Sequence, residues 1–396
     1  MAGTKASSTV RETLQLSSTV ISPGVLSNLP WLTELSIDVY PEDHRWDTNV
    51  EVIVKEICQL TRLGTLELYI PQVNHLGPLI QFMRRLSPKS LSFKLVVGHH
   101  MKRIISCVPL EVEAEFLKWD KCLKFVKGVD ILDEVKAALK CATALYLDRH
   151  VTVTRLSKFF GIENTTKLKF CIVAECHEME TIVDGEEIYE EGVGPIYNGY
   201  KENKDISDKE YPSFGSLQCL EIHYMKNLRC IWKGPIHEGC LHYLKLLALH
   251  TCPELETIFT LGMLSKLFYL EELIVKDCPK VNSLVSDEPL DPQPEINLPN
   301  LKKISLLHLL NLLSISRGLC IGPQLQKIGF YNCPKLKSLS TPELSSNKLK
   351  MIKGEKKWWE TLTWSETEWG HQKHKQDYLH SIFSPVNRED DIMTQL

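Results

Sequence analysis

Apolar residues recur along this chain at regular intervals. Three strings show the pattern first: Cys252–Leu255, Cys278–Val281 and Cys333–Leu336 each read cysteine, proline, any residue, then leucine or valine. The first two cysteines are 26 residues apart and the next two are 55 apart, which is about two periods. Reading outward from each string gives the frame L-x-x-L-x-L-x-x-C-x-x-L-x-x-L, in which other apolar residues replace leucine. The chain is therefore predicted to consist of stacked copies of one short unit.

The frame is clear in the second half of the chain and weaker before residue 114. Units that fill it closely have these central apolar pairs: Leu145 and Leu147, Cys171 and Val173, Leu220 and Ile222, Leu247 and Leu249, Leu273 and Val275, Ile304 and Leu306, Ile328 and Phe330. Weaker units are predicted at Thr13–Leu16, Leu32–Ile37, Leu63–Leu68, Leu91–Phe93 and Ala114–Phe125. The interval from Leu168 to Leu217 is anomalous, at 49 residues.

The frame has a simple physical meaning. Residues that alternate along a strand point to opposite sides, so the apolar residues face in and the others face out. One unit cannot bury its own apolar face, so neighbouring units must stack and form a parallel sheet. We therefore expect an α/β leucine-rich-repeat solenoid: a curved horseshoe with parallel strands on the concave face and irregular loops and short helical turns on the convex face.

The frame and its interruptions predict the domain organisation. The expected segments are an N-terminal edge segment at 1–28, the repeat array at 29–350, a Trp-rich C-terminal cap at 351–369 and a frayed polar tail at 370–396. Residues 184–210 hold nine acidic side chains and interrupt the array, so we expect an exposed loop insertion, with a partner contact as the alternative. Residues 286–300 form a shorter, Pro-rich interruption.

The same frame predicts which residues point away from the core, namely those that flank the central apolar pair of each strand. Several of them, including Phe170, Ile172, Leu246, Ile274 and Leu307, are apolar, and contiguous exposed apolar surface usually marks an interaction site. Cover by a loop or by another domain is the alternative. We expect the concave-face partner-binding residues to be Tyr146, Phe170, Ile172, Glu221, His223, Leu246, His250, Glu272, Ile274, Lys276, Lys303, Lys327 and Tyr331.

Composition narrows the environment. The chain is 43% hydrophobic and 24% charged, which is typical of a folded soluble protein, and its net charge of −4 provides no basic surface for nucleic acid. Its first residues hold no signal-peptide core, and no apolar run reaches the roughly 18 residues of a membrane span. The 13 cysteines lie mostly inside apolar repeats, which favours reduced thiols. We expect a cytoplasmic protein without a membrane span or nucleic-acid partner.

The sequence contains no motif of the common enzyme classes. It lacks a phosphate loop, a dinucleotide-binding glycine motif, a zinc-protease motif and a serine-hydrolase elbow. The segment His237–His242 has ligand-type residues but no second half at zinc-site spacing. His250 and Cys252 point to opposite sides of the frame. We therefore expect no enzymatic activity, no catalytic residue, no cofactor and no metal site.

The repeat units resemble the irregular cytoplasmic repeats of plant intracellular immune receptors, the coiled-coil, nucleotide-binding, leucine-rich-repeat (NLR) disease resistance proteins. Three further strings, Ala142–His150, Phe214–Ile222 and Ile352–Trp359, are similar to the carboxy-terminal half of that family. The resemblance covers roughly residues 25–370.

The resemblance implies that the repeats recognise a pathogen effector or a guarded host protein. It also implies that they hold a nucleotide-binding domain, in cis or in trans, inactive until defence signalling begins. Because this sequence lacks a phosphate loop and a preceding coiled coil, nucleotide binding is assigned to no residue here. We predict a protein-recognition and autoregulatory module of a plant immune receptor. The alternative is a generic intracellular repeat adaptor or ubiquitin-ligase substrate receptor, for which residues 1–28 are too short to form the expected adaptor-binding box.

Overall fold

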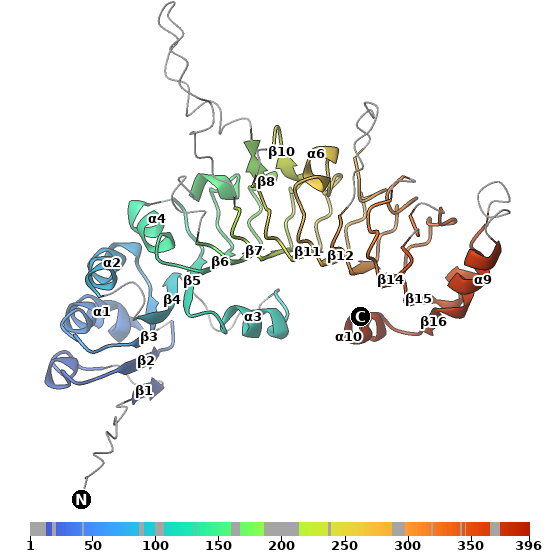
Figure 1. Cartoon of the computed structure of the whole chain (residues 1–396). Helices are drawn as coiled ribbons and strands as arrows, with labels where there is room; N and C mark the ends of the chain where they lie inside the picture. Colours follow the sequence, from blue (N-terminus) through green and yellow to red (C-terminus); the bar gives the residue numbers. More distant parts are fainter. Residues whose placement is uncertain are drawn as a thin grey trace, which may run out of the picture. The chain divides into compact units, whose positions relative to one another are not determined.

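The computed structural model divides the chain into two compact units, Met1–Tyr146 and Leu147–Leu396, and each is described by itself (Figure 1). The structure describes residues 13–17, 21–41, 43–86, 91–99, 107–130, 132–159, 167–185, 214–236, 239–286, 298–317, 320–340, 343–344, 346–364 and 373–396.

The first unit is built on a parallel sheet whose strands lie side by side in chain order. Its strands are β1 (Thr13–Ser17), β2 (Glu34–Asp38), β3 (Thr65–Ile70), β4 (Ser92–Gly98) and β5 (Lys121–Val126), and β6 (Ala144–Asp148) crosses the unit boundary. Its helices are η1 (Leu26–Asn28), α1 (His44–Ile57), η2 (Val73–His75), α2 (Leu76–Arg85), α3 (Leu110–Phe116) and α4 (Asp133–Leu139). Strands at four of the weaker predicted units, from Thr13 to Phe93, are confirmed.

The helices of this unit exceed the short turns that were predicted. Helix α1 is 14 residues long, because the 30 residues between the paired positions Leu35 and Leu66 leave room for it. Its buried residues Val50, Ile53 and Ile57 recur at helical spacing. The Asp43 side chain caps its first turn by accepting a hydrogen bond from the backbone N–H of Arg45 at 3.0 Å.

The unit predicted at Ala114–Phe125 has its strand in the wrong place. The frame assigned Leu117 and Trp119 to a strand, but helix α3 ends at Phe116 and β5 begins at Lys121. Leu117 is exposed, whereas Cys122 and Phe125 are buried. The error arose because apolar residues three apart in a helix satisfy the same L-x-x-L spacing as a repeat.

The second unit holds the regular part of the array (Figure 1). Its parallel sheet has the order β7 (Phe170–Ala174), β9 (Cys219–His223), β11 (Leu246–His250), β12 (Glu272–Lys276), β13 (Lys303–Leu307), β14 (Lys327–Tyr331), β15 (Met351–Glu355) and β16 (Phe383–Val386). A two-stranded sheet pairs β8 (Thr181–Asp184) with β10 (Cys230–Lys233). The helices are η3 (Leu156–Phe159), α6 (Leu261–Leu264), α7 (Lys356–Glu360), α9 (Lys373–Ser381) and α10 (Glu389–Gln395). The frame's inward residues, such as Leu247 and Leu273, are buried as predicted.

Each of these strands from β7 to β14 is followed by a residue in the left-handed backbone region. The bend residues include Glu175, Tyr224, Thr251, Asp277, His308 and Asn332, with φ between 51° and 55°. The N–H of Thr251 donates to the last carbonyl of the next strand, that of Lys276, at 2.9 Å, and Glu175, Tyr224, Asp277 and His308 do the same to their neighbours. Asn332 instead donates to the Glu355 carboxylate at 2.7 Å. This bend turns the chain inward and joins each repeat to the next.

The residue after the bend is often cysteine, and its environment explains the choice. The thiols of Cys252, Cys278 and Cys333 lie 3.4–3.6 Å from the carbonyl two residues earlier. Burial raises the pKa of Cys333 to about 11 and that of Cys176 to about 12, so both stay protonated. All thirteen cysteines, each in the described part of the chain, are free thiols. Cysteine acts here as a small buried apolar residue with a weak donor.

The described residues of the predicted frayed tail at 370–396 form regular elements, which corrects that prediction, whereas the predicted cap at 351–369 stays a prediction. Strand β15 is a further repeat strand, and the indole N–H of Trp358 donates to the Leu336 carbonyl at 2.9 Å. The described residues 373–396 form α9, β16 and α10, and β16 pairs in parallel with β15. The segment is polar in sequence, but Leu379, Val386 and Ile392 are buried, and strand pairing satisfies its backbone.

The predicted interruptions lie mostly outside the described residues. Only Asp184 and Gly185 of the acidic insertion at 184–210 are described, and only residues 286 and 298–300 of the Pro-rich one. Both remain predictions.

Two consecutive leucines offer a matched test of the frame. Leu312 is 0% exposed and lies at a frame position, whereas Leu313 is 59% exposed. We expect Leu312→Asp to cost more than about 4 kcal/mol, because it buries an unpaired charge, and to lower Tm by at least about 8 °C. Leu313→Asp should leave Tm within about 2 °C. Thermal unfolding followed by circular dichroism measures both, and equal Tm values for the two variants would contradict the frame.

The bend makes a separate prediction at Thr251. A β-branched residue is strained at its φ of 55°, whereas asparagine tolerates this conformation. Thr251→Asn should therefore stabilise the protein by about 0.5–1 kcal/mol. Thr251→Pro removes the N–H that bonds to Lys276 and forbids the bend, so it should destabilise strongly. Denaturant titration of both variants measures the two effects, and a loss of stability in Thr251→Asn would refute the assigned strain.

Candidate functional site: the outer face of the second unit

Side chains that point away from the core of the second unit form rows across its sheet, because the strands pair in parallel register. We call this surface the outer face. Its middle row is Ile172, Glu221, Ala248, Ile274, Ser305, Gly329 and Lys353. The next row is Ala174, His223, His250, Lys276, Leu307 and Tyr331. Neighbouring strands lie about 4.8 Å apart, so adjacent members of a row are in contact range.

Five of the predicted partner-binding residues are not accessible. Tyr146, Phe170, Ile172, Glu221 and His223 are at most 5% exposed, so the prediction of exposure is wrong for them. Leu307, also predicted to be exposed, is buried on β13, against which α10 packs. Tyr146, in the first unit, is covered by the Phe116 ring at 5.9 Å and the Lys124 ammonium at 4.1 Å from its ring centroid. Close strand spacing lets large side chains cover one another's flanks, which the frame does not reveal.

The other predicted residues keep part of their side chains accessible. They are Leu246, His250, Glu272, Ile274, Lys276, Lys303, Lys327 and Tyr331. Lys303 lies 3.8 Å from Glu272 on the neighbouring strand, and both are about one-third exposed. Such solvated pairs contribute little to stability, so their charges stay available to a partner. The half-buried Ile274 adds an apolar centre to this charged surface.

Helix α10 lies against the outer face at β13 and β14. Gly329 allows this approach, because a Cβ there would lie 2.5 Å from Ile392 Cγ2 and 2.7 Å from Leu396 Cδ1. Ile392 is fully buried by this packing. The helix therefore covers the part of the predicted partner-binding surface around Lys327.

Polar contacts fix both ends of α10. The Glu389 carboxylate accepts a hydrogen bond from Lys276 Nζ at 3.1 Å and lies 2.7 Å from His308 Nε2. Burial raises the pKa of Glu389, but hydrogen bonds from His308 and Lys276 outweigh it, and the net pKa is below its usual value. At the other end, Lys327 Nζ donates to the carbonyls of Gln395 and Leu396 at 3.3 and 3.4 Å.

A compact polar cluster occupies the outer face on β9 and β11. Glu221 Oε2 lies 3.1 Å from His223 Nε2, and the His223 and His250 rings stack at 4.5 Å with an interplanar angle of 10°. One ligand-type atom from each of the three residues lies within 4.8 Å of the others. Burial, and then the charges of His223 and Lys276, lower the pKa of His250 to about 3, so its imidazole is neutral at physiological pH. The sequence placed all three residues on this face, and a signal for their meeting was available, because His223 and His250 occupy the same position of consecutive repeats.

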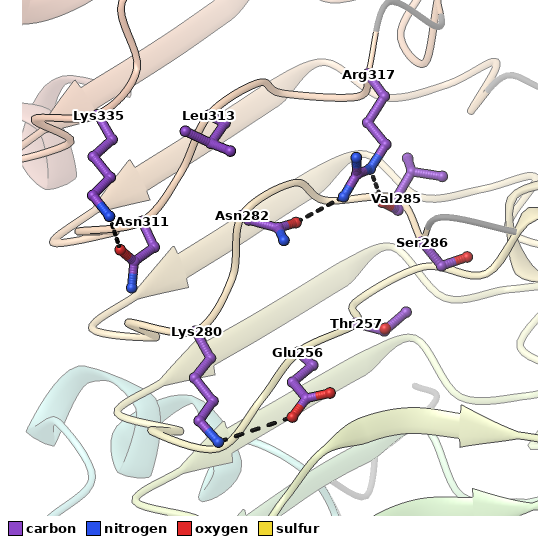
Figure 2. Close-up of a pocket in the computed structure, with 10 residues that line it drawn as sticks. All are labelled: Glu256, Thr257, Lys280, Asn282, Val285, Ser286, Asn311, Leu313, Arg317 and Lys335. Carbon is purple, nitrogen blue, oxygen red and sulfur yellow. Dashed lines mark hydrogen bonds and ion pairs between the residues drawn. The ribbon is translucent and has the colours of Figure 1, made fainter.

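A polar pocket of about 590 Å³ lies away from the outer face, on the loops that follow β11 to β14 (Figure 2). Its cations already have protein partners. Arg317 Nη2 donates to Asn282 Oδ1 at 2.9 Å, and Lys335 Nζ donates to Asn311 Oδ1 at 2.7 Å. None of the predicted partner-binding residues lines it.

An aromatic cluster before β11 and β12 was also missed by the sequence analysis. His242, Tyr243, Phe268 and Tyr269 contact one another with ring centroids 5.0–6.0 Å apart. Tyr243 and Phe268 are about half exposed. The signal was available, because Tyr243 and Tyr269 occupy the same position of consecutive repeats and stack directly.

Comparison with known proteins defines the class of this repeat region. The family model for the leucine-rich repeats of RPS2-like plant disease resistance proteins matches residues 143–279, which include β7 to β12. The chain is also similar to disease resistance protein At4g27190 of Arabidopsis thaliana, with 25% identity over 368 residues. That alignment covers 89% of this chain and 33% of the relative, so the chain spans about a third of the length of the curated protein it matches.

These findings confirm the predicted resemblance. The chain carries a leucine-rich-repeat region of the kind found in plant disease resistance proteins, folded as an α/β solenoid with parallel strands. Among the described residues, no helix has the length and apolar character needed to cross a membrane.

The contacts of Glu389 predict how firmly α10 is held. Glu389→Gln should speed hydrogen exchange of the α10 amides about 5–10-fold, because it weakens two charge-assisted contacts on a partly exposed group. Since the pKa of Glu389 is lowered on folding, its contribution is present above its ordinary pKa of 4.5 and is lost as pH falls through the lowered value. The protection factors of the wild-type α10 amides, which compare the observed exchange with the intrinsic exchange at the same pH, should therefore fall at acidic pH.

Asp390→Asn provides the matched control, because Asp390 is exposed on the same helix. Its exchange rates should stay within twofold of wild type. Equal rates in Glu389→Gln and wild type would show that the ion pairs do not hold the helix.

Proposed function

We propose that this chain is the protein-recognition and autoregulatory repeat module of a plant intracellular immune receptor that acts in the defence response to pathogens. The observation that carries the proposal is the accessible part of the outer face on β11 to β14. It combines the half-buried apolar side chains Leu246 and Ile274 with the charged side chains Glu272, Lys303 and Lys327. The sequence similarity to plant disease resistance proteins supports the same conclusion.

The chemistry of this surface suits a protein partner. Rigid strands hold the side chains in rows, so apolar and charged groups are presented at fixed spacing without a loop having to be ordered first. Unlike a nucleic-acid surface, the outer face carries both charge signs, with Glu272 beside Lys303. We propose a pathogen effector or a guarded host protein as the partner, bound in the cytoplasm, and no enzymatic reaction on the chain itself.

The autoregulatory part of the proposal rests on α10. This helix covers Gly329 and binds Lys276 and Lys327, which lie in the proposed partner surface. A partner that needs these lysines must displace α10, so the helix sets a threshold for recognition. The family resemblance implies that a nucleotide-binding domain, in cis or in trans, would respond to partner binding. The alternative function, that of a ubiquitin-ligase substrate receptor, ranks below this proposal, because the relatives found by sequence comparison are disease resistance proteins.

The proposal is tested by changing one apolar residue on the outer face. Ile274→Glu places a carboxylate in the centre of the accessible surface, where a bound partner would have to desolvate it. In plants that lack the endogenous gene and express this variant, the pathogen-induced ion leakage that the wild-type chain supports should fall at least tenfold. Abundance of the protein, measured on blots, should be unchanged.

Leu313→Glu is the matched control, because it adds the same charge at an exposed leucine outside the outer face. It should retain wild-type ion leakage. A full response from Ile274→Glu, or an equal loss in both variants, would refute the outer face as the recognition surface.

A further inference from the structure

The cluster of Glu221, His223 and His250 has the geometry of a metal-binding site. His223 and His250 are direct partners in the register of β9 and β11, so their imidazoles lie side by side on the outer face. Glu221 is two residues before His223 and therefore points to the same side of its strand. Three ligand-type side chains thus converge from two rigid neighbouring strands.

The distances suit one small cation. Two ligands of a tetrahedral zinc ion, each about 2.0–2.1 Å from the metal, lie roughly 3.3 Å apart. Glu221 Oε2 and His223 Nε2 are 3.1 Å apart, and all three donor atoms lie within 4.8 Å of one another. The His250 ring stacks nearly parallel on that of His223, so its side chain has to rotate for one of its nitrogens to complete the set.

Burial leaves the cluster short of polar partners. His223 is 0% exposed, and its Nδ1 atom has no hydrogen-bond partner among the described residues. In the same described part of the chain, the buried Glu221 carboxylate has one ion-pair partner, His223. A buried carboxylate and an unpartnered imidazole nitrogen are each unfavourable unless another group compensates them. A divalent cation held by Glu221 Oε2 and His223 Nε2 would compensate the buried carboxylate.

We propose that Glu221, His223 and His250 bind a zinc ion, with a water molecule as the fourth ligand. Two imidazoles and a carboxylate with one open position form a ligand set that protein zinc sites use. Nitrogen ligands favour zinc and similar transition metals over magnesium and calcium, which prefer oxygen. Of the three side chains, that of His250 is partly exposed, whereas Glu221 and His223 are buried.

Lys276, whose positive charge would repel a bound cation, pairs with His250 in the register of β11 and β12. Its ammonium is already engaged by Glu389 at 3.1 Å, which compensates its charge. A bound ion would join two consecutive repeats across the outer face, so it should also stabilise the second unit.

Calorimetric titration of the purified, EDTA-treated full chain with zinc chloride tests the site. We expect one zinc ion per chain to bind, with magnesium chloride giving no heat above dilution. Glu221→Gln and His250→Ala should each weaken zinc binding at least tenfold. In a parallel thermal scan, free zinc at 100 times its Kd should raise the Tm of the wild type by about 5 °C, and should not raise that of His250→Ala.

His177→Ala is the control, because His177 is an exposed histidine of the same unit outside the cluster. It should bind zinc with an affinity within twofold of wild type. Absence of zinc binding to the wild type would overturn the proposal and leave a buried Glu221–His223 ion pair as the account of the cluster. Zinc binding that survives both cluster variants would also overturn it, because the ion would then lie elsewhere.

Discussion

The hydrogen bond from the left-handed bend of one repeat to the end of the next strand is the contact on which the array depends. A non-glycine residue in this backbone region costs about 1 kcal/mol, and bends of this kind recur from Glu175 to Asn332. The bond that offsets this cost, such as Thr251 to Lys276 at 2.9 Å, exists only when the neighbouring repeat is in place. The bend then turns the cysteine position inward, where Cys252 and Cys278 are buried. The strain of each bend is therefore offset by a hydrogen bond to the next repeat and not by a bond inside its own repeat. This makes the second unit cooperative along its length.

The buried positions of the repeat were predictable from the sequence, but the left-handed bend was not. A buried position admits few residue types, so Leu273, Leu312 and Ile328 stand out at a constant period. The bend position holds Glu175, Tyr224, Thr251 and Asp277 in successive repeats, so it carries no shared residue type. The prediction failed where another element has the same spacing, as at Leu117 after helix α3. It failed again at the C-terminus, where three buried residues in a polar segment, among them Leu379, were too few to show a period.

The sequence predicted the side of the sheet to which the side chains of the candidate site point, but not how accessible they are. Alternation along a strand reveals that Ile172 and Ile274 point the same way, but Ile172 is buried and Ile274 is half-buried. Groups distant in sequence also change accessibility, as with Ile392, which lies over Gly329 from 63 positions further along the chain. The meeting of His223 and His250 likewise depends on the register between strands. The repeat frame sets that register by pairing Leu220 with Leu247 and Ile222 with Leu249, so the contact between the two histidines could have been predicted from their shared frame position.

Lys276 connects two features of the outer face, the cluster around His250 and the docked helix α10. It lies beside His250 in the register and bonds to Glu389 at the start of α10. While α10 is docked, the carboxylate of Glu389 compensates the lysine charge. When α10 leaves, an uncompensated cation stands next to the proposed zinc ligands and opposes a bound cation. Docking of α10 and zinc binding should thus favour each other, and by linkage each stabilises the other to the same degree. A partner that displaces α10 would weaken the metal site in the same event.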